Sequence, residues 1–367
     1  ISNFQAQLFH PLNLLLIATV GYSAAVLQVQ LVLIFFLAGV GMYLCGRAHG
    51  LSRAPSLLAG IIFPACGFFV GNASYFPQIN TLAAAPYVLF FLIRVGKGGK
   101  WGSVLGGACA QAVMIFSGFP TLAFFLLVFF LAWSICNVWT PASVGGGEKR
   151  RRTFRILATV LAGAGLSACL LLPAFESYPL ISRPDAAGGT GLALNPSTVQ
   201  EKSLAPGNLL SVVFPFLGLN RISDYNLWIE FRNCSIGVVG MIFAFYYLVV
   251  IKSVRRVALA VILLFSVFFA LGFNTPVYAF FYKRILPFSM VSHPALDFRA
   301  IFLFFLCLCA GFGLQGFLNG NIERRKKLWF ILISAVAGFA VSAIFFQGFR
   351  SLLSSGSWFW LVSILAL

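Results

Sequence analysis

The sequence predicts an all-α protein, a polytopic transmembrane helical bundle of about ten or eleven spans. Three observations lead to this prediction: the composition, the spacing of the apolar windows, and the placement of charge between them. Hydrophobic residues make up 60% of the 367 residues, mean hydropathy is +0.96, and only 9% of the residues are charged. Because so little polar surface cannot cover a water-soluble particle of this size, the bilayer must be part of the solvent.

The apolar windows have the length of membrane spans, which need about 20 mostly apolar residues. They lie near residues 24–46, 55–72, 77–94, 101–118, 120–139, 154–175, 235–251, 257–273, 300–319 and 328–348, and an eleventh begins near 357. Residues 11–21 are apolar as well, but the stretch 10–46 is too long for one span and too short for two. The first piece is therefore predicted to be an interfacial or re-entrant helix near the N-terminus.

Basic residues gather in alternate loops between these windows. One set of loops holds 17 of the 25 Lys and Arg residues and two of the eight acids, a net charge of +15, whereas the other set carries +2. By the positive-inside rule the first set is cytoplasmic. It comprises the loops at 47–53, 95–100, 140–153, 252–256 and 320–327. The N-terminal segment and a long loop at 177–234 are then extracytoplasmic.

The net charge of +17 does not predict a nucleic-acid partner. A nucleic-acid surface needs its basic residues on one polar face or arm, interleaved with aromatics, and here they form short clusters between spans. Topology and contact with anionic lipid account for most of the basic excess.

The cysteines and the chain ends lead to two further expectations. Seven of the eight cysteines lie inside apolar runs and Cys234 lies at the edge of one, so no disulfide framework and no CxxC metal pattern is predicted. The chain starts at Ile1 without a start methionine and stops at Leu367 inside an apolar run. We therefore expect residues 1–367 to be a single transmembrane domain and an internal fragment of a longer protein.

The extracytoplasmic loops hold six of the eight acids and two of the three histidines. Long loops of this kind usually serve function. Several segments then resemble one family in order along the chain: "NFQAQLFHPLNLL", "LAGVGMYLCGRAHGLSRAPSLLAGIIFPACGFFVGN", "LLPAFESYPLISR", "SLAPGNLLSVVFP", "IGVVGMIFA", "LALGFNTPVYAFFYKRILPF" and "HPALDFRAIFLFFLCLCAGFGLQGF". Together they resemble the YfhO-type family of bacterial membrane proteins, which belongs to the GT-C superfamily of polyprenyl-phosphate-sugar-dependent glycosyltransferases.

The resemblance implies a GT-C-like bundle in the bacterial cytoplasmic (inner) membrane, with its active face extracytoplasmic. It implies transfer of a sugar from a polyprenyl-phosphate-linked donor to an envelope glycan or polymer. This chain departs from the family's sequence pattern in two places. The family commonly has an arginine just before the proline of the penultimate outer loop, where this chain has Ser292 and His293. The superfamily's main aspartate lies in a first outer loop of which this chain holds only the exit, so the main carboxylate is expected upstream of Ile1.

Two other classes of function stay open beside the glycosyltransferase. They are a transporter or flippase of lipid-linked glycans, and a non-catalytic membrane subunit. A transporter would be expected to show repeated halves and charged or broken helices near the midplane. The sequence shows no clear repeat, and its apolar windows are nearly free of charge.

Transfer from a lipid phosphate needs a carboxylate to activate the acceptor and cationic groups to stabilise the leaving phosphate. Asp297 and Glu176 are the candidate catalytic carboxylates. Arg183 and Arg299 are the candidate phosphate partners, because a guanidinium at a span end can bind phosphate through two hydrogen bonds. The competing interpretation is that both arginines only reach the lipid headgroups, and that Glu176 is an ordinary interfacial residue.

The stretch "HPALDFR" at 293–299 is predicted to start a helix. Pro294 fits the first helical position, His293 would cap the helix, and Asp297 would lie four residues later on the same face. Asp297 could equally complement the positive end of the helix dipole. The remaining candidate substrate-binding residues are His293, Asn3, Gln5 and His10. No metal site is predicted from three histidines, although a divalent metal as cofactor is left open.

Small-residue tracts at 161–168 and 310–316 are predicted to be helix-packing surfaces. Gln111, well inside a window, is predicted to make an interhelical hydrogen bond.

Overall fold

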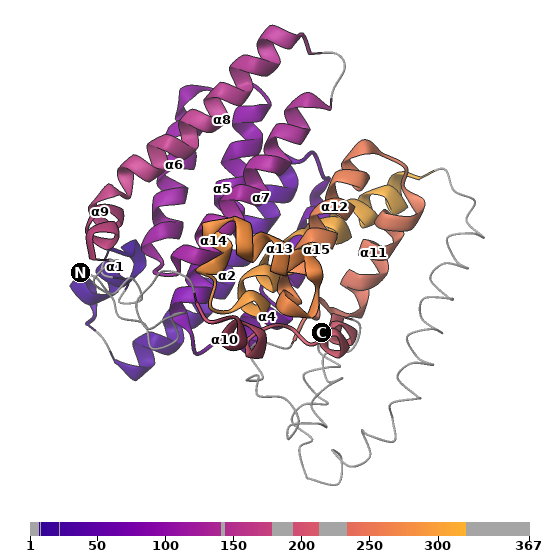
Figure 1. The fold of residues 1–367 in the computed structure, drawn as a ribbon. Helices are drawn as coiled ribbons and strands as arrows, with labels where there is room; N and C mark the ends of the chain where they lie inside the picture. The colour runs from indigo at the N-terminus through magenta and orange to yellow at the C-terminus, as the bar shows by residue number, and fades with distance from the viewer. Residues whose placement is uncertain are drawn as a thin grey trace.

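A computed structural model of the protein describes residues 7, 9–21, 23–140, 144–177, 194–212 and 233–320. Within these ranges every regular element is a helix, which confirms the predicted all-α class (Figure 1). The α-helices are α1 (Pro11–Thr19), α2 (Ala24–Ala48), α3 (Arg53–Ile62), α4 (Gly67–Gly71), α5 (Phe76–Gly96), α6 (Trp101–Phe116), α7 (Pro120–Trp139), α8 (Gly146–Leu166), α9 (Ala168–Ser177), α10 (Pro196–Glu201), α11 (Gly237–Val250), α12 (Val254–Ala270), α13 (Pro276–Arg284), α14 (Leu286–Ser289) and α15 (Pro294–Asn319). Two 3-10 helices, η3 (Pro206–Val212) and η6 (Gly272–Asn274), lie between them.

Five helical segments in the described ranges are long and apolar enough to cross a membrane, and α8 with α9 makes a sixth if this pair, bent by 69°, counts as one span. The five are α2, α3 with α4, α5, α7 and α15. Helices α6 and α11 are apolar but have only 16 and 14 residues. A multi-pass bundle is therefore shown. The count of ten or eleven stays a prediction, since the windows at 328–348 and beyond 357 lie outside the described residues.

Two helices form the centre of the bundle. Helix α15 packs against α3, α7, α11 and α12, and α5 packs against α2, α6 and α7. Aromatic side chains fill the seam between α7 and α15, where the rings of Phe125 and Phe298 lie 4.7 Å apart and those of Phe130 and Phe304 lie 4.9 Å apart. Because α15 is surrounded, side chains on all its faces are buried along most of its length.

The loops separate to two ends of the bundle. His49, Lys97, Arg152 and Arg255, from four of the five basic loops, line one cavity. We call this the basic end. Helix α15 also finishes there, since the Ser52 backbone N–H donates to Oε1 of Gln315 at 2.7 Å.

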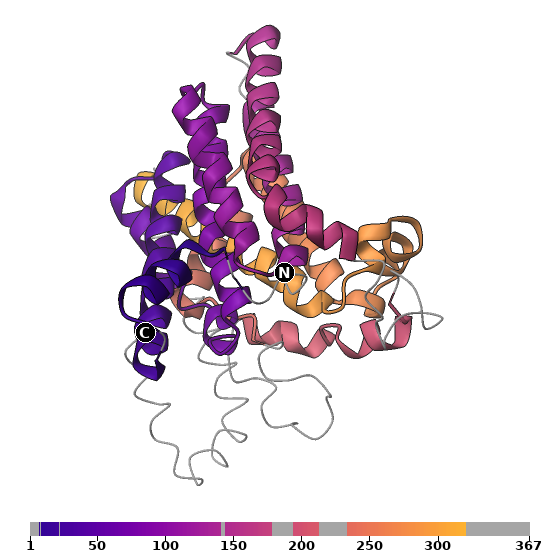
Figure 2. The same ribbon diagram turned by 90° about the vertical axis from the view of Figure 1, so that its left-hand side faces the viewer.

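The opposite end carries the short helices, and we call it the loop end. Here the Gly67 N–H donates to the Ser235 carbonyl at 2.8 Å, and the Leu204 N–H donates to the Ala270 carbonyl at 2.9 Å. In Figures 1 and 2 the start of α8 projects at the top of the view, and α10 lies toward the bottom. The alternation of loops predicted from charge is thus present in three dimensions.

The small-residue tracts are packing surfaces, as predicted. A Cβ placed on Gly163 of α8 would lie 2.6 Å from Cδ of Gln111 in α6, and Gly313 of α15 lies directly against the backbone of Phe243 in α11. Gln111 makes the interhelical bond expected of it, with Nε2 donating to the Val160 carbonyl at 3.0 Å. Glycine is needed at these positions because the helices approach more closely than a methyl group allows.

Candidate functional site

The candidate site is at the loop end, where α15 begins. Pro294 occupies the first turn of α15 and His293 is its N-cap residue, as the sequence predicts. The His293 carbonyl accepts the N–H of Asp297 at 3.1 Å, the first i to i+4 bond of the helix. The His293 side chain does not cap the helix, and its Nδ1 lies 2.7 Å from the Ser292 hydroxyl. The helix therefore starts six residues before the apolar window at 300 and carries Asp297 and Arg299 into the bundle.

Arg299 is fully buried, with 0% of its surface exposed. Its Nη1 donates to the Asn233 carbonyl at 3.1 Å, and its guanidinium carbon lies 5.5 Å from the centre of the Phe68 ring. These contacts fix the guanidinium between α4 and the segment leading into α11. The interpretation of Arg299 as a side chain that extends to lipid headgroups is wrong, because its guanidinium is buried inside the bundle against Asn233 and Phe68.

Asp297 is buried on another side of the same helix, with 1% of its surface exposed. Its Oδ1 has no hydrogen-bond partner among the described residues. No ion pair joins it to Arg299, because side chains two positions apart on a helix point in different directions. Burial raises the pKa of Tyr278 in α13, and the nearby Asp297 carboxyl adds to that rise.

A second polar group holds the N-terminal segment against the bundle at the same end. Nε2 of Gln7 donates to the Ser117 carbonyl at 2.8 Å, and Oε1 of Gln7 accepts from Nδ2 of Asn13 at 3.0 Å and from Nδ2 of Asn80 at 3.2 Å. Nε2 of Gln30 in α2 donates to Oδ1 of Asn13 at 2.7 Å. We call these four side chains the amide network. It joins α1, α2, α5 and the turn before α7.

His10 lies beside this network as the N-cap residue of α1. It is buried, and burial lowers its pKa from 6.5 to about 4, against the raising effect of Asn13. The imidazole is therefore neutral at physiological pH and can accept or donate one hydrogen bond. Both groups border the N-terminal part of α7. Ser117, in the turn before α7, accepts from Gln7 of the amide network, and Phe125, in the second turn of α7, contacts Phe298 of α15.

The other predicted site residues lie apart from these two groups or outside the described ranges. Glu176, near the end of α9, is exposed. Asn3, Gln5 and Arg183 fall outside the described residues. The prediction that Arg183, Arg299, Glu176 and the N-terminal segment share one outward cavity therefore stays a prediction.

Sequence reasoning missed the amide network. Gln30 and Asn80 stand inside the windows 24–46 and 77–94, where a polar side chain must find a partner. That signal was present in the sequence, although it could not identify Gln7 and Asn13 as the partners. Among the described residues, no group of three or more His, Cys, Asp or Glu side chains is arranged to hold a metal ion.

Comparison with known proteins does not extend this picture. No family model matches the chain, and neither the curated proteins nor the solved structures contain a match to it.

Proposed function

We propose that this chain is the membrane domain of a bacterial protein that binds a polyprenyl-phosphate-linked sugar at the loop end and transfers the sugar to an extracytoplasmic glycan or polymer. The observation that carries the proposal is the pair of ionisable side chains, Asp297 and Arg299, buried in the first two turns of α15 with no ion pair between them. The family resemblance and the charge asymmetry of the loops support it.

Burial of an arginine has a large desolvation cost, which is offset when the guanidinium meets an anion or several acceptors. Arg299 donates to the Asn233 carbonyl and lies against the Phe68 ring, and its guanidinium carries five N–H donors in one plane. A phosphate is an anion that a planar guanidinium binds through two parallel hydrogen bonds. Arg299 is therefore the residue we assign to the donor phosphate.

Asp297 is assigned to the acceptor. A general base must reach the hydroxyl proton that it removes, within about 3 Å. The Oδ1 atom of Asp297 makes no hydrogen bond to the described protein, so it is available to an acceptor hydroxyl. His293 and His10 are assigned to sugar hydroxyls. Glu176 is the second carboxylate candidate, and its exposure places it further from a desolvated reaction centre.

The orientation follows from the positive-inside rule. The basic end carries the charge excess and is placed in the cytoplasm, so the loop end faces the side on which envelope polymers are built.

The test separates binding from transfer in proteoliposomes that contain a polyprenyl-phosphate sugar. Binding is measured with a photoactivatable donor on the chain described here. Transfer is measured on the same chain in the same proteoliposomes. Arg299→Ala should abolish crosslinking, and Asp297→Asn, which keeps the side-chain shape, should leave crosslinking intact. The Arg299→Ala variant should also transfer the sugar about a hundredfold more slowly, because it loses a contact to the charge that develops on the phosphate. This factor corresponds to about 3 kcal/mol.

The matched control is Glu201→Gln, an exposed acid at the end of α10, which should retain binding and transfer. If Arg299→Ala binds the donor as well as the parent protein does, the assignment of the donor phosphate is wrong. Donor binding without transfer would instead favour a flippase or a non-catalytic subunit.

A further inference from the structure

A second site lies at the basic end, remote from α15's first turns. A cavity of about 80 Å³ opens among the ends of α2, α5, α7, α8 and α12. Its lining residues are His49, Ile93, Gly96, Lys97, Ser134, Asn137, Val138, Arg152 and Arg255. Three of them are cationic and none is acidic, so the cavity is a concentration of positive charge.

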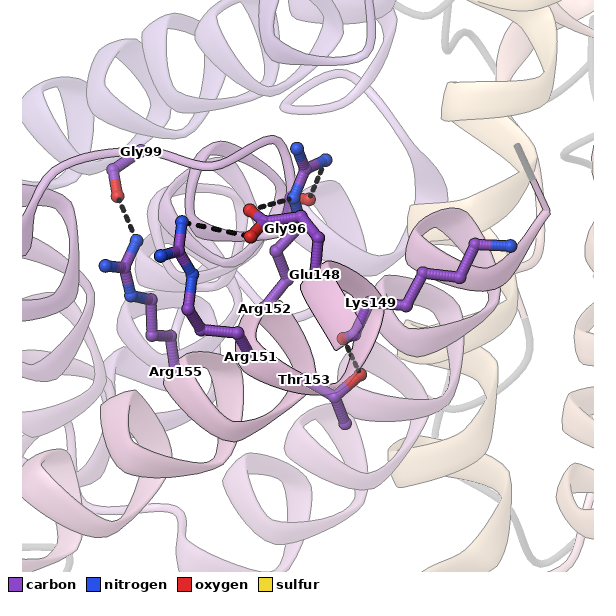
Figure 3. Close-up of polar contacts among 8 residues, drawn as sticks. All are labelled: Gly96, Gly99, Glu148, Lys149, Arg151, Arg152, Thr153 and Arg155. Carbon is purple, nitrogen blue, oxygen red and sulfur yellow. Dashed lines mark hydrogen bonds and ion pairs between the residues drawn. The ribbon is translucent and has the colours of Figure 1, made fainter. Parts of the chain in front are cut away.

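Two of the three cations have hydrogen-bond partners in the protein, and one of these two also has an ion pair. Nζ of Lys97 donates to the Ala48 carbonyl at the end of α2, at 2.7 Å. Nη1 of Arg152 donates to the Gly96 carbonyl at 3.3 Å, and Nε of Arg152 pairs with Glu148 at 2.9 Å (Figure 3). Glu148 also pairs with Arg151 at 3.0 Å, so its single charge is divided between two arginines.

Among the described residues, Arg255 is the lining cation without a hydrogen-bond partner or ion pair. Desolvation lowers the pKa of Lys97, and the nearby positive charge of Arg255 lowers it further. Even if the ends of α2 and α5 each count as about half a negative charge, positive charge remains in excess around the cavity.

A polar group without a partner also lines the cavity. The Ser134 side chain is 1% exposed, and its hydroxyl makes no hydrogen bond among the described residues. Buried hydroxyl groups in folded proteins are almost always paired with protein, water or ligand. The neighbouring imidazole of His49 is already occupied, because Nε2 accepts from the Trp133 indole at 2.8 Å and Nδ1 lies 2.8 Å from the Cys45 carbonyl. The Ser134 hydroxyl is therefore available to bond a molecule that occupies the cavity.

We propose that this cavity binds one phosphate group, held by Arg255 and Lys97 and by a hydrogen bond from the Ser134 hydroxyl. A phosphate has several acceptor oxygens and up to two negative charges. These match two cations, Lys97 at the end of α5 and Arg255 of α12, and one neutral donor, the Ser134 hydroxyl of α7. The site holds no carboxylate ligand, so it is not suited to a divalent cation.

The size of the cavity limits the occupant. A buried water needs about 10–15 Å³ of this measure, so 80 Å³ accommodates a small oxyanion and not a nucleotide. The cavity lies at the ends of membrane-crossing helices, where lipid phosphates are found, and Lys97 on its rim is exposed. The phosphate can therefore come from an anionic lipid headgroup or from free phosphate in solution.

Binding is tested with the purified chain in phosphatidylcholine nanodiscs. One arm titrates inorganic phosphate by calorimetry, and the other measures retention of phosphatidic acid by native mass spectrometry. We expect saturable binding of one phosphate group in at least one arm. Phosphatidic acid alone would identify a lipid headgroup, and inorganic phosphate would identify a site open to solution. Arg255→Gln and Ser134→Ala should each weaken binding about tenfold or more.

The matched control is Arg256→Gln, which removes the same charge from the next residue of α12 but does not line the cavity. It should bind within about twofold of the parent protein. Equal weakening by Arg256→Gln would show non-specific attraction to a basic surface, and absence of saturable binding in both arms would also overturn the proposal. Ser134→Ala keeps all charges and removes one small atom, so its result stands even if Arg255→Gln folds poorly.

Discussion

Replacing Gln30 with leucine should loosen the attachment of the N-terminal segment. Gln30 is fully buried in α2, and its Nε2 donates to Oδ1 of Asn13 at 2.7 Å. Interhelical hydrogen bonds in membrane proteins contribute about 0.6 kcal/mol on average, with a maximum of about 1.7. The substitution also leaves Oδ1 of Asn13 without that donor, and an unsatisfied buried group costs about 1 kcal/mol or more. Gln30→Leu should therefore destabilise the fold by about 2 kcal/mol.

Unfolding can be followed in detergent with a thiol-reactive fluorophore. Cys45, Cys66, Cys234, Cys307 and Cys309 are buried, so they react only when the bundle opens. The exposed Cys109 and Cys169 give a constant background. The entropy of unfolding is about 2.1 cal/mol/K per residue, so in a chain of 367 residues a loss of about 2 kcal/mol should lower the apparent melting temperature by about 2–3 °C.

The control is Gln28→Leu, two residues away on the same helix. Gln28 is exposed, so leucine there should shift the melting temperature by less than about 1 °C. Equal shifts for the two variants, or a higher melting temperature for Gln30→Leu, would refute the account of the amide network as a structural attachment.

Three further predictions follow from the fold. With an impermeant thiol reagent and a background lacking the native cysteines, Gly207→Cys should label from outside the cell and Arg150→Cys should not; outside labelling at 150 would overturn the orientation. Burial lowers the pKa of His49 from 6.5 to about 4. As pH falls, the unfolded chain therefore binds a proton at His49 before the folded chain does. The stability present above pH 6.5 is lost progressively down to about pH 4. The loss is about 2 kcal/mol at pH 5, and His49→Gln should flatten the melting temperature measured from pH 7.5 to pH 5. Gly163→Ala should destabilise by about 1–3 kcal/mol because its Cβ has no space, whereas Gly165→Ala on the same helix meets nothing within 4 Å and should be neutral or stabilising in the same thermal assay.

Much of the architecture could be predicted from the sequence. The helical class, the approximate positions of α2, α5, α7 and α15, and the separation of loops to two ends follow from apolar length and charge placement. These properties are readable in one dimension because a bilayer requires each segment to satisfy its own backbone hydrogen bonds. The start of α15 at Pro294 was likewise predictable, since a proline at the first helical position depends only on local conformation.

Only the tertiary structure decided which polar side chains meet. The sequence placed Arg299 at the membrane surface, but packing of α3, α7, α11 and α12 around α15 buries it against Asn233 and Phe68. The amide network and the cationic cavity are likewise built from residues far apart in the chain, Gln7 with Asn80 and Lys97 with Arg255. Composition determines that such groups must find partners in a medium of low dielectric constant. Which partner each one finds depends on the three-dimensional packing of helices that local sequence does not encode.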